Sequence, residues 1–306
     1  MRNIGRYMWL GLLLSAAVAC RKEDDITPEA AVPNPFYPDA AATDEYSQLR
    51  REFYAETGCY LLFNDTLKYE YTGTDRYGNP LYSMELLDLP YGVTSSVQWK
   101  FVFNYSTNVQ QARQAAEIVK KDILSAMDKR YHPYSFLLVK DFMTYTYMIE
   151  EGEPNGYWSG PNSVETYYIG ERAILMSIDA LLKDKETMKN KFLRRLLDKQ
   201  LTTTVLKDFY APGDTYYGQD WTGDFADEYD FISRTGILAF EESHGVGEEF
   251  PTYWVQSKTA DLKVFLDDLL LGQEEEFMAK YAEYPIVQEK FRLLKKTVID
   301  LGFNIN

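Results

Sequence analysis

The chain has 306 residues, and 32 Lys and Arg against 47 Asp and Glu give it a formal net charge of −15 at pH 7. Nucleic acids and anionic lipid surfaces bind basic patches, so this acidic balance argues against both as partners. The two cysteines, Cys20 and Cys59, are too few for a disulfide framework. We expect Cys59 to be a small buried core residue.

The first 19 residues have the layout of a secretory signal peptide. Arg2 and Arg6 precede an apolar run over 7–14, and small residues follow up to Ala19. Cys20, directly after "AAVA", resembles the lipobox cysteine of bacterial lipoproteins, which is lipidated and becomes the mature N-terminus. Lipidation of Cys20 implies outer-membrane lipid as the anchoring partner, because several acyl chains anchor stably. The alternative is an ordinary signal peptide that ends near Ala19.

The residues after Cys20 predict an exposed anchor and a tether. "RKEDD" at 21–25 resembles the surface-export signal of Bacteroidota lipoproteins, which implies the outer membrane and the extracellular side. From there to residue 45 the chain is rich in Pro, Ala, Thr and Asp without apolar periodicity, which predicts a disordered tether. We therefore expect a signal peptide over 1–19, a lipidated tether over 20–45 and one domain over 46–306.

The first part of this domain has strand patterns followed by one helix. Aromatic and aliphatic runs separated by turn residues predict strands, here "CYLLFND", "LKYEYTG", "PLYSMELL" and "SVQWKFVFNY", with "DRYGNP" as a hairpin turn. Apolar residues at three- and four-residue spacing over 106–130 predict an amphipathic helix, with Ser106 or Thr107 as N-cap. "SFLLVKDF" at 135–142 is nearly continuously apolar and predicts a central strand.

The second part is mainly helical in pattern. "ETYYIGERAILMSI" at 165–178 predicts a strand or a strand pair, and 185–209 predicts a helix. Two loops rich in aromatic residues flank these segments. The final third predicts helices over 231–240, 259–272 and 284–303. The fold class is therefore α+β, with an N-terminal mixed sheet, one long helix and a helical C-terminal part.

Three stretches carry a resemblance to a known family. They are "FYAETGCYLLFND", "ARQAAEIVKKDILSAMDKRYHPYSFLLVKDF" and the closing "SKTADLKVFLDDLLLGQEEEFMAKYAEYPIVQEKFRLLKKTVIDLGFNIN". With them the chain resembles the zinc-binding metallopeptidase lipoproteins of Bacteroidota, which are encoded beside TonB-dependent transporters and their lipoprotein lids. The resemblance covers nearly the whole mature chain. It implies a zincin-like single domain, a zinc cofactor and a nutrient-uptake complex as partner.

The family's chemistry would come from HExxH on a helix, where two histidines bind zinc and a glutamate activates water. The equivalent positions here are "KQLTT", so Lys199 and Thr203 replace the histidines and Gln200 replaces the glutamate. Protonated lysine has no free lone pair, and glutamine cannot act as a base. We therefore expect a degenerate domain that is non-catalytic and binds no metal.

A rebuilt zinc site is the alternative, and it would make the protein an active zinc-dependent peptidase. Glu241, His244 and Glu248 in "FEESHGVGEEF" would lie on one face if 238–248 were a helix. Two carboxylates and one imidazole form a known catalytic zinc set. Gly245 and Gly247 interrupt a helix at this point, so the pattern favours an acidic loop.

The aromatic residues of the two loops suggest a binding role. Tyr157, Trp158, Tyr217 and Trp221 lie among Gly, Asn and Asp. Flat rings with short polar neighbours suit contact with a peptide or a glycan. The alternative is that these rings pack back onto the domain and hold its loops. The binding interpretation predicts an accessory subunit of a nutrient-uptake complex.

Overall fold

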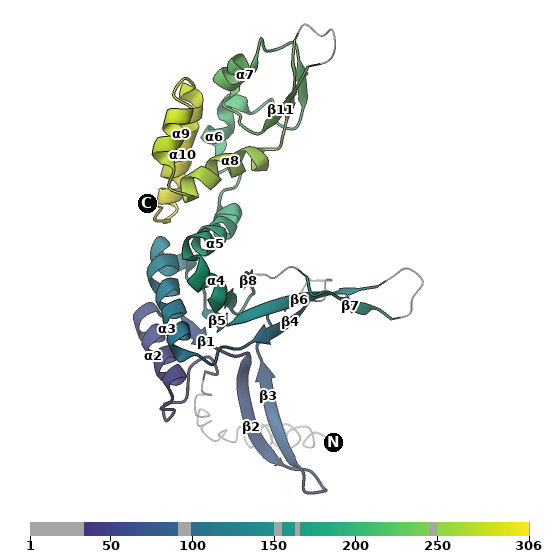
Figure 1. Ribbon diagram of the computed structural model, residues 1–306, viewed down its shortest axis with the longest axis vertical. Helices are drawn as coiled ribbons and strands as arrows, with labels where there is room; N and C mark the ends of the chain where they lie inside the picture. The colour runs from purple at the N-terminus through teal and green to yellow at the C-terminus, as the bar shows by residue number, and fades with distance from the viewer. Residues whose placement is uncertain (1–33, 91–98, 150–154, 163–165, 245–249, 306) are drawn as a thin grey trace, which may run out of the picture. The chain divides into compact units, whose positions relative to one another are not determined.

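The computed structural model describes residues 34–90, 99–149, 155–162, 166–244 and 250–305 (Figure 1). The fold is mixed α+β in one domain, as the sequence predicted. A compact unit extends from Phe36 to Asn306, so it begins before the expected boundary at residue 46. The expected signal peptide and Cys20 lie outside the described residues. No helix in the described part of the chain has the length and apolar character needed to cross a bilayer.

A four-stranded mixed sheet lies at the centre of the N-terminal half. Its order is β1 (Tyr60–Leu62), β5 (Ser135–Val139), β9 (Ile174–Ser177) and β8 (Tyr167–Ile169). The first three strands are parallel, and β8 is antiparallel to β9. Every residue of β5 is buried. The predicted central strand and the predicted strand pair are therefore both confirmed.

Alternate residues of this sheet contribute to two hydrophobic clusters, as the two-residue period of a strand requires. Leu61, Phe136 and Met176 belong to the larger cluster, together with residues of α2 (Glu45–Thr57) and α3 (Val109–Ile118). The opposite face contributes to a smaller cluster that contains Phe36, Leu62, Leu67, Leu87, Leu89, Leu137, Val139, Phe142, Ala173 and Leu175. The sheet is therefore covered on both faces.

The helices on this sheet differ in part from the prediction. Residues 45–57 form α2, a helix that the sequence analysis did not predict. Asp44 caps this helix by accepting a hydrogen bond from the Ser47 backbone amide. The N-cap of α3 is Asn108, not Ser106 or Thr107, and its side chain accepts from two backbone amides. A π turn, η1 (Val119–Ile123), continues α3.

Two smaller sheets are formed by strands that lie between those of the central sheet in the chain. The predicted hairpin forms from β2 (Thr66–Thr74) and β3 (Pro80–Leu86), and it extends away from the other sheets (Figure 1). A three-stranded sheet has the order β4 (Trp99–Asn104), β6 (Asp141–Met148) and β7 (Tyr157–Ser159). The continuation of the chain as β6 and the short β7 were not predicted.

The C-terminal part is not purely helical, which corrects the prediction. A three-stranded antiparallel sheet has the order β10 (Asp220–Thr222), β12 (Thr252–Val255) and β11 (Phe240–Ser243). Gly236 (φ 63°) ends the helix before β11, so residues 231–240 are only partly helical. The helices of this part are α4 (Ile178–Lys183), α5 (Lys185–Gln200), α6 (Lys207–Tyr210), α7 (Glu228–Thr235), α8 (Lys258–Leu270), α9 (Glu274–Lys280) and α10 (Pro285–Asp300).

Candidate functional site

The helix that was expected to carry the family's motif ends before Thr203. α5 ends at Gln200, so Lys199 and Gln200 lie in its last turn and Thr203 lies in the turn that follows. Residues 202–205 are "TTTV", and β-branched residues have low helix propensity. The expected helical register is therefore wrong at Thr203, and the three positions do not share one helix face.

Thr203 instead lines a polar hollow of about 490 Å³. The other lining residues are Thr204, Lys207, Tyr210, Ala211, Asp214 and Lys258. Lys258 forms an ion pair with Asp214 and lies 5.4 Å from the centre of the Tyr210 ring. Lys199 and Gln200 do not line this hollow. The structure therefore does not assemble the substituted motif into one cleft.

The acidic stretch just before His244 is a strand, β11, whereas the sequence favoured a loop and the zinc alternative required a helix. Glu241 and Ser243 alternate with Phe240 and Glu242 along β11, which pairs with β12. His244 Nε2 lies 3.1 Å from Glu242 Oε1, a carboxylate that does not belong to the proposed zinc set. β11 ends at Ser243, so His244 lies just beyond the strand that carries Glu241. Glu248 lies outside the described residues, and the helical face assumed for the rebuilt zinc site does not form.

Among the described residues, no group of three or more His, Cys, Asp or Glu side chains is close enough to hold a metal ion. The other histidine, His132, follows a 3₁₀ turn, η3 (Lys129–Tyr131), and its Nε2 lies 3.1 Å from the Leu124 carbonyl oxygen. His132 therefore lies in the connection between η3 and β5.

Tyr217 turns inward and joins a buried polar cluster, which we call the Lys290 cluster: Tyr217, Asp261 and Lys290. Lys290 Nζ lies 2.6 Å from Asp261 Oδ2 and donates to the Gly236 carbonyl oxygen at 2.8 Å. The Tyr217 hydroxyl donates to Asp261 Oδ2 at 2.7 Å. The other oxygen, Asp261 Oδ1, accepts from the Leu238 amide at 2.8 Å. Tyr217 therefore packs onto the domain and is not a free binding residue.

The electrostatics of the Lys290 cluster indicate a structural role. Asp261 and Lys290 are fully buried, and Nζ lies above the rings of Phe209 and Phe265. Burial lowers the pKa of Lys290, and Asp261 opposes this effect. Burial and the negative charge of Asp261 raise the pKa of Tyr217. Buried charges need such partners. The polar atoms of the Lys290 cluster already form hydrogen bonds to one another and to the backbone.

The remaining predicted aromatic residues do not form one platform. Tyr157 and Trp158 are neighbours in β7, so their side chains point to opposite faces of the strand. The Trp158 ring packs edge-on against Tyr147, with 5.3 Å between centroids. Trp221, in β10, donates from Nε1 to the Tyr216 carbonyl oxygen at 3.1 Å. Trp221 therefore holds its own loop.

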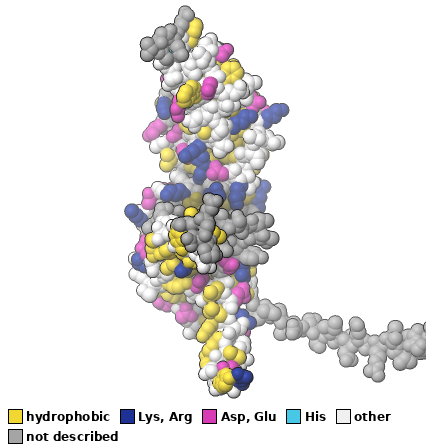
Figure 2. Space-filling view, turned by 90° about the vertical axis from the view of Figure 1, so that its right-hand side faces the viewer, with side chains coloured by type: hydrophobic (Ala, Val, Ile, Leu, Met, Phe, Trp, Pro, Cys, Tyr) yellow, Lys and Arg dark blue, Asp and Glu magenta, His cyan; other side chains and the backbone are white. Residues whose placement is uncertain are grey.

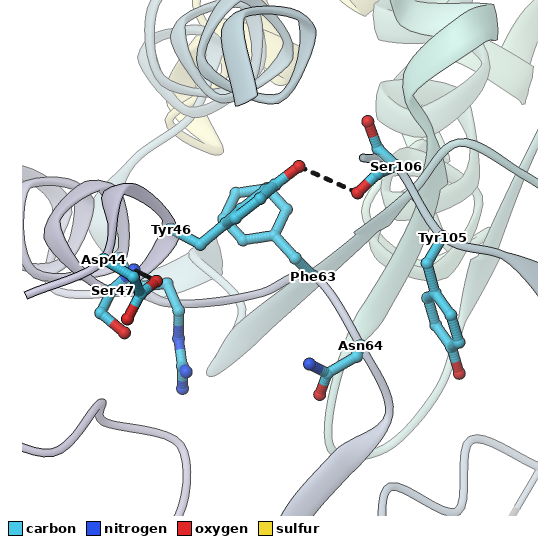
Figure 3. Close-up of a pocket in the computed structure, with 8 residues that line it drawn as sticks. Asp44, Tyr46, Ser47, Phe63, Asn64, Tyr105 and Ser106 are labelled. Carbon is cyan, nitrogen blue, oxygen red and sulfur yellow. Dashed lines mark hydrogen bonds between the residues drawn. The ribbon is translucent and has the colours of Figure 1, made fainter. Parts of the chain in front are cut away.

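A second hollow, of about 360 Å³, lies at the start of α2 (Figure 3). Its lining includes Asp44, Tyr46, Ser47, Arg50, Phe63, Asn64, Tyr105 and Ser106. The Arg50 guanidinium donates to the carbonyl oxygens of Leu61 and Phe36, both at 2.8 Å. Tyr46 donates to the Ser106 carbonyl oxygen, and Asp44 caps the helix. These polar groups are used to hold the fold together.

A highly exposed aromatic surface lies on the β2–β3 hairpin, and sequence reasoning missed it as a site. Tyr69, Tyr71, Tyr82 and Met84 share one face, because Tyr69 pairs with Met84 and Tyr71 with Tyr82. We call these four residues the aromatic face. Their exposed fractions are 62%, 59%, 49% and 59%. Figure 2 shows hydrophobic side chains along the hairpin, the lowest part of that view.

The opposite face of the hairpin is polar, which makes the exposure of the aromatic face notable. Lys68, Glu70, Ser83 and Glu85 occupy it by the same register, with the apolar Leu81 near the turn. On the aromatic face, the Tyr69 and Tyr82 rings stack at 4.8 Å. A two-stranded hairpin does not bury such a face by itself. The alternation "LKYEY" in the sequence indicated a strand with one apolar face. It could not indicate whether another element covers that face.

No protein-family model, no curated protein and no solved structure matches this chain. The assignment of function therefore rests on the geometry of the chain's own residues.

Proposed function

We propose that the protein is a surface-anchored lipoprotein with a degenerate, non-catalytic zinc-metallopeptidase-like domain, and that it is an accessory binding component of a nutrient-uptake complex. Cys20 is the lipidated residue, and the domain faces the extracellular side of the outer membrane. The partner is a TonB-dependent transporter or its lipoprotein lid. The observation that carries the binding role is the exposed aromatic face of the β2–β3 hairpin.

The form of this surface favours a protein partner over a small ligand. Small-molecule sites are concave, whereas the aromatic face lies on a projecting two-stranded ribbon. Tyrosine and methionine are enriched at protein interfaces, and exposed apolar patches on soluble domains mark interaction sites. A peptide or glycan site at Tyr157 and Trp158 has less support, since those side chains point to opposite faces.

Affinity purification of the full mature lipoprotein from its native membrane tests the proposal. We expect a transporter or lid protein to co-purify, and we expect the double substitution Tyr71→Ser/Tyr82→Ser to reduce its yield at least tenfold. Tyr229→Ser is the matched control, because Tyr229 is also about half exposed but lies in α7. Equal loss in the control, or the absence of any co-purifying transporter or lid protein, would contradict the proposal.

The non-catalytic part is tested by the zinc content of the protein purified without chelator and with zinc supplied. We expect much less than one zinc per chain and no cleavage of a peptide library. About one zinc per chain that is lost in His244→Ala would instead support the rebuilt peptidase site.

The anchor is tested by the substitution Cys20→Ser. We expect it to move the protein from the outer-membrane fraction to the soluble fraction, because the acyl chains supply the membrane affinity. Retention in the membrane fraction would contradict lipidation at Cys20.

A further inference from the structure

The two strands of the β2–β3 hairpin differ at their outer edges. In the described part of the chain, β2 and β3 pair only with each other. The register shifts between Thr66 and Lys68 and again between Tyr71 and Gly73, while the paired residues of β3 run on without interruption. Both extra residues, Leu67 and Thr72, therefore lie in β2.

These bulges affect only one edge. A β-bulge breaks the spacing of backbone donors and acceptors and twists the strand, which protects an edge from further pairing. The β2 edge carries two such interruptions along Thr66–Thr74. The β3 edge has regular spacing from Leu81 to Leu86, and its Pro80 is only the first residue of the strand. The edge of β3 is therefore the one that can accept another strand.

We propose that an extended segment of a partner protein adds to the β3 edge as a third strand, with apolar residues at alternate positions. This inference rests on the binding role proposed above and names its mode. Side chains opposite Tyr82 and Met84 would continue the aromatic face, and those opposite Ser83 would lie on the polar face. Backbone hydrogen bonds supply affinity in such strand addition, and alternate side chains supply specificity.

The size of the aromatic face favours a partner over a second copy of this chain. At the exposures given above, four such side chains offer on the order of 450 Å² of surface. Packing two copies face to face would bury roughly 900 Å² in total, below the ~1,200 Å² of a stable interface. A third strand instead adds a row of backbone hydrogen bonds to the side-chain contacts. It also gives the hairpin the strand number that independent sheets need.

The test uses the full mature chain in detergent and a phage-displayed library of random dodecapeptides as the probe. We expect enriched peptides to alternate apolar and polar residues. Hydrogen exchange followed by mass spectrometry should then show slower exchange over 81–86 when the best peptide binds, with little change over 66–74. Met84→Lys should weaken binding at least tenfold, whereas the matched control Met148→Lys, in β6, should not.

Four outcomes would overturn strand addition. They are the absence of enriched peptides, enrichment without alternation, slower exchange outside β3, and equal weakening by Met148→Lys. A homodimer in light scattering that Met84→Lys dissociates would assign the edge to a second copy and would also overturn it. If a transporter or lid protein co-purifies through Tyr71 and Tyr82 while β3 exchange is unchanged, the proposed function stands and strand addition fails.

Discussion

Tyr253 has a fully buried side chain whose hydroxyl lacks a hydrogen-bond partner among the described residues. Its ring stacks on Phe231 at 4.6 Å. Removing an unpaired buried hydroxyl removes its desolvation cost, which is about 1–3 kcal/mol. We therefore expect Tyr253→Phe to raise the free energy of unfolding by about 1 kcal/mol at neutral pH, measured by urea denaturation. A loss of stability would show that the hydroxyl has a partner.

The same residue gives a pH dependence. Burial, followed by the charge of Glu242, raises the pKa of Tyr253 from 10.0 to about 12. The unfolded state therefore ionises first, and the wild type loses stability as pH rises from about 10 to about 12. The stability advantage of Tyr253→Phe over the wild type should grow between pH 9 and 11. A constant difference would contradict the raised pKa.

The Lys290 cluster predicts a large effect from one substitution. Lys290→Met leaves the buried Asp261 without its cation, and breaking a buried pair in this way costs about 3–5 kcal/mol. We expect a loss of this size in urea denaturation. The double substitution Asp261→Asn/Lys290→Met should recover part of it, because no lone buried charge remains. Full additivity of the two single effects would contradict the coupling.

At the residue scale, the sequence could predict single environments but not long-range partners. The burial of Cys59, 1% exposed, is confirmed. Tyr217 was placed among binding candidates because its loop is polar and rich in glycine. Its partner Lys290 lies 73 positions away in the chain, and no local pattern indicates that contact. The strand β11 before His244 was also missed by local reasoning, and so was the contact of His244 with Glu242.

At the element scale, two glycines with positive φ allow the cost of backbone strain to be compared with that of strain plus a clash. Gly236, at the end of α7, has φ 63°, and a Cβ there would lie 2.6 Å from Ile286 Cγ2. Gly218 has φ 72° and open space around it. We expect Gly218→Ala to cost about 1–2 kcal/mol from backbone strain alone. Gly236→Ala should cost at least about 1–3 kcal/mol more, because the clash adds to the strain.

Urea denaturation of both variants checks this comparison. Equal costs would mean that the α7–α10 contact relaxes to accept a methyl group. Far-ultraviolet circular dichroism of both variants controls for a change in the folded state.

Several elements that are long enough to show a periodic pattern were predicted, and some short ones were missed. The α8 and α10 helices and the β2–β3 hairpin follow from their own periodicity and turn residues. The strands β10, β11 and β12 have three or four residues each, which is too short to show a period. The predicted helix at 185–209 failed at the "TTTV" run, where propensity opposed an otherwise apolar pattern.

At the scale of the whole molecule, Phe36 predicts where the folded chain begins. Its side chain is 3% exposed in the smaller core cluster, and its carbonyl oxygen accepts from Arg50. Loss of a buried Phe side chain costs about 3–5 kcal/mol. We expect a chain that starts at residue 43 to lose at least about 3 kcal/mol relative to one that starts at residue 34, in urea denaturation.

Phe36→Ala in the longer chain is the matched control and should show most of the same loss. Equal stability of the two chain lengths would mean that residues 34–42 contribute nothing to the core. The predicted boundary at residue 46 lies after the buried Phe36. The Pro- and Ala-rich composition of this segment gives no sign that one of its aromatic rings belongs to the core.

Because Cys59 is buried, the rate at which a thiol reagent modifies it reports how often the domain opens. The thiol lies between Gly58, which ends α2, and the start of β1, and burial raises its pKa. A thiol reagent therefore reaches Cys59 only when α2 separates from the central sheet, since the thiolate is the reactive form. Under the acylation of Cys20 and the surface location proposed above, labelling kinetics on intact cells would measure the lifetime of the closed domain without purification.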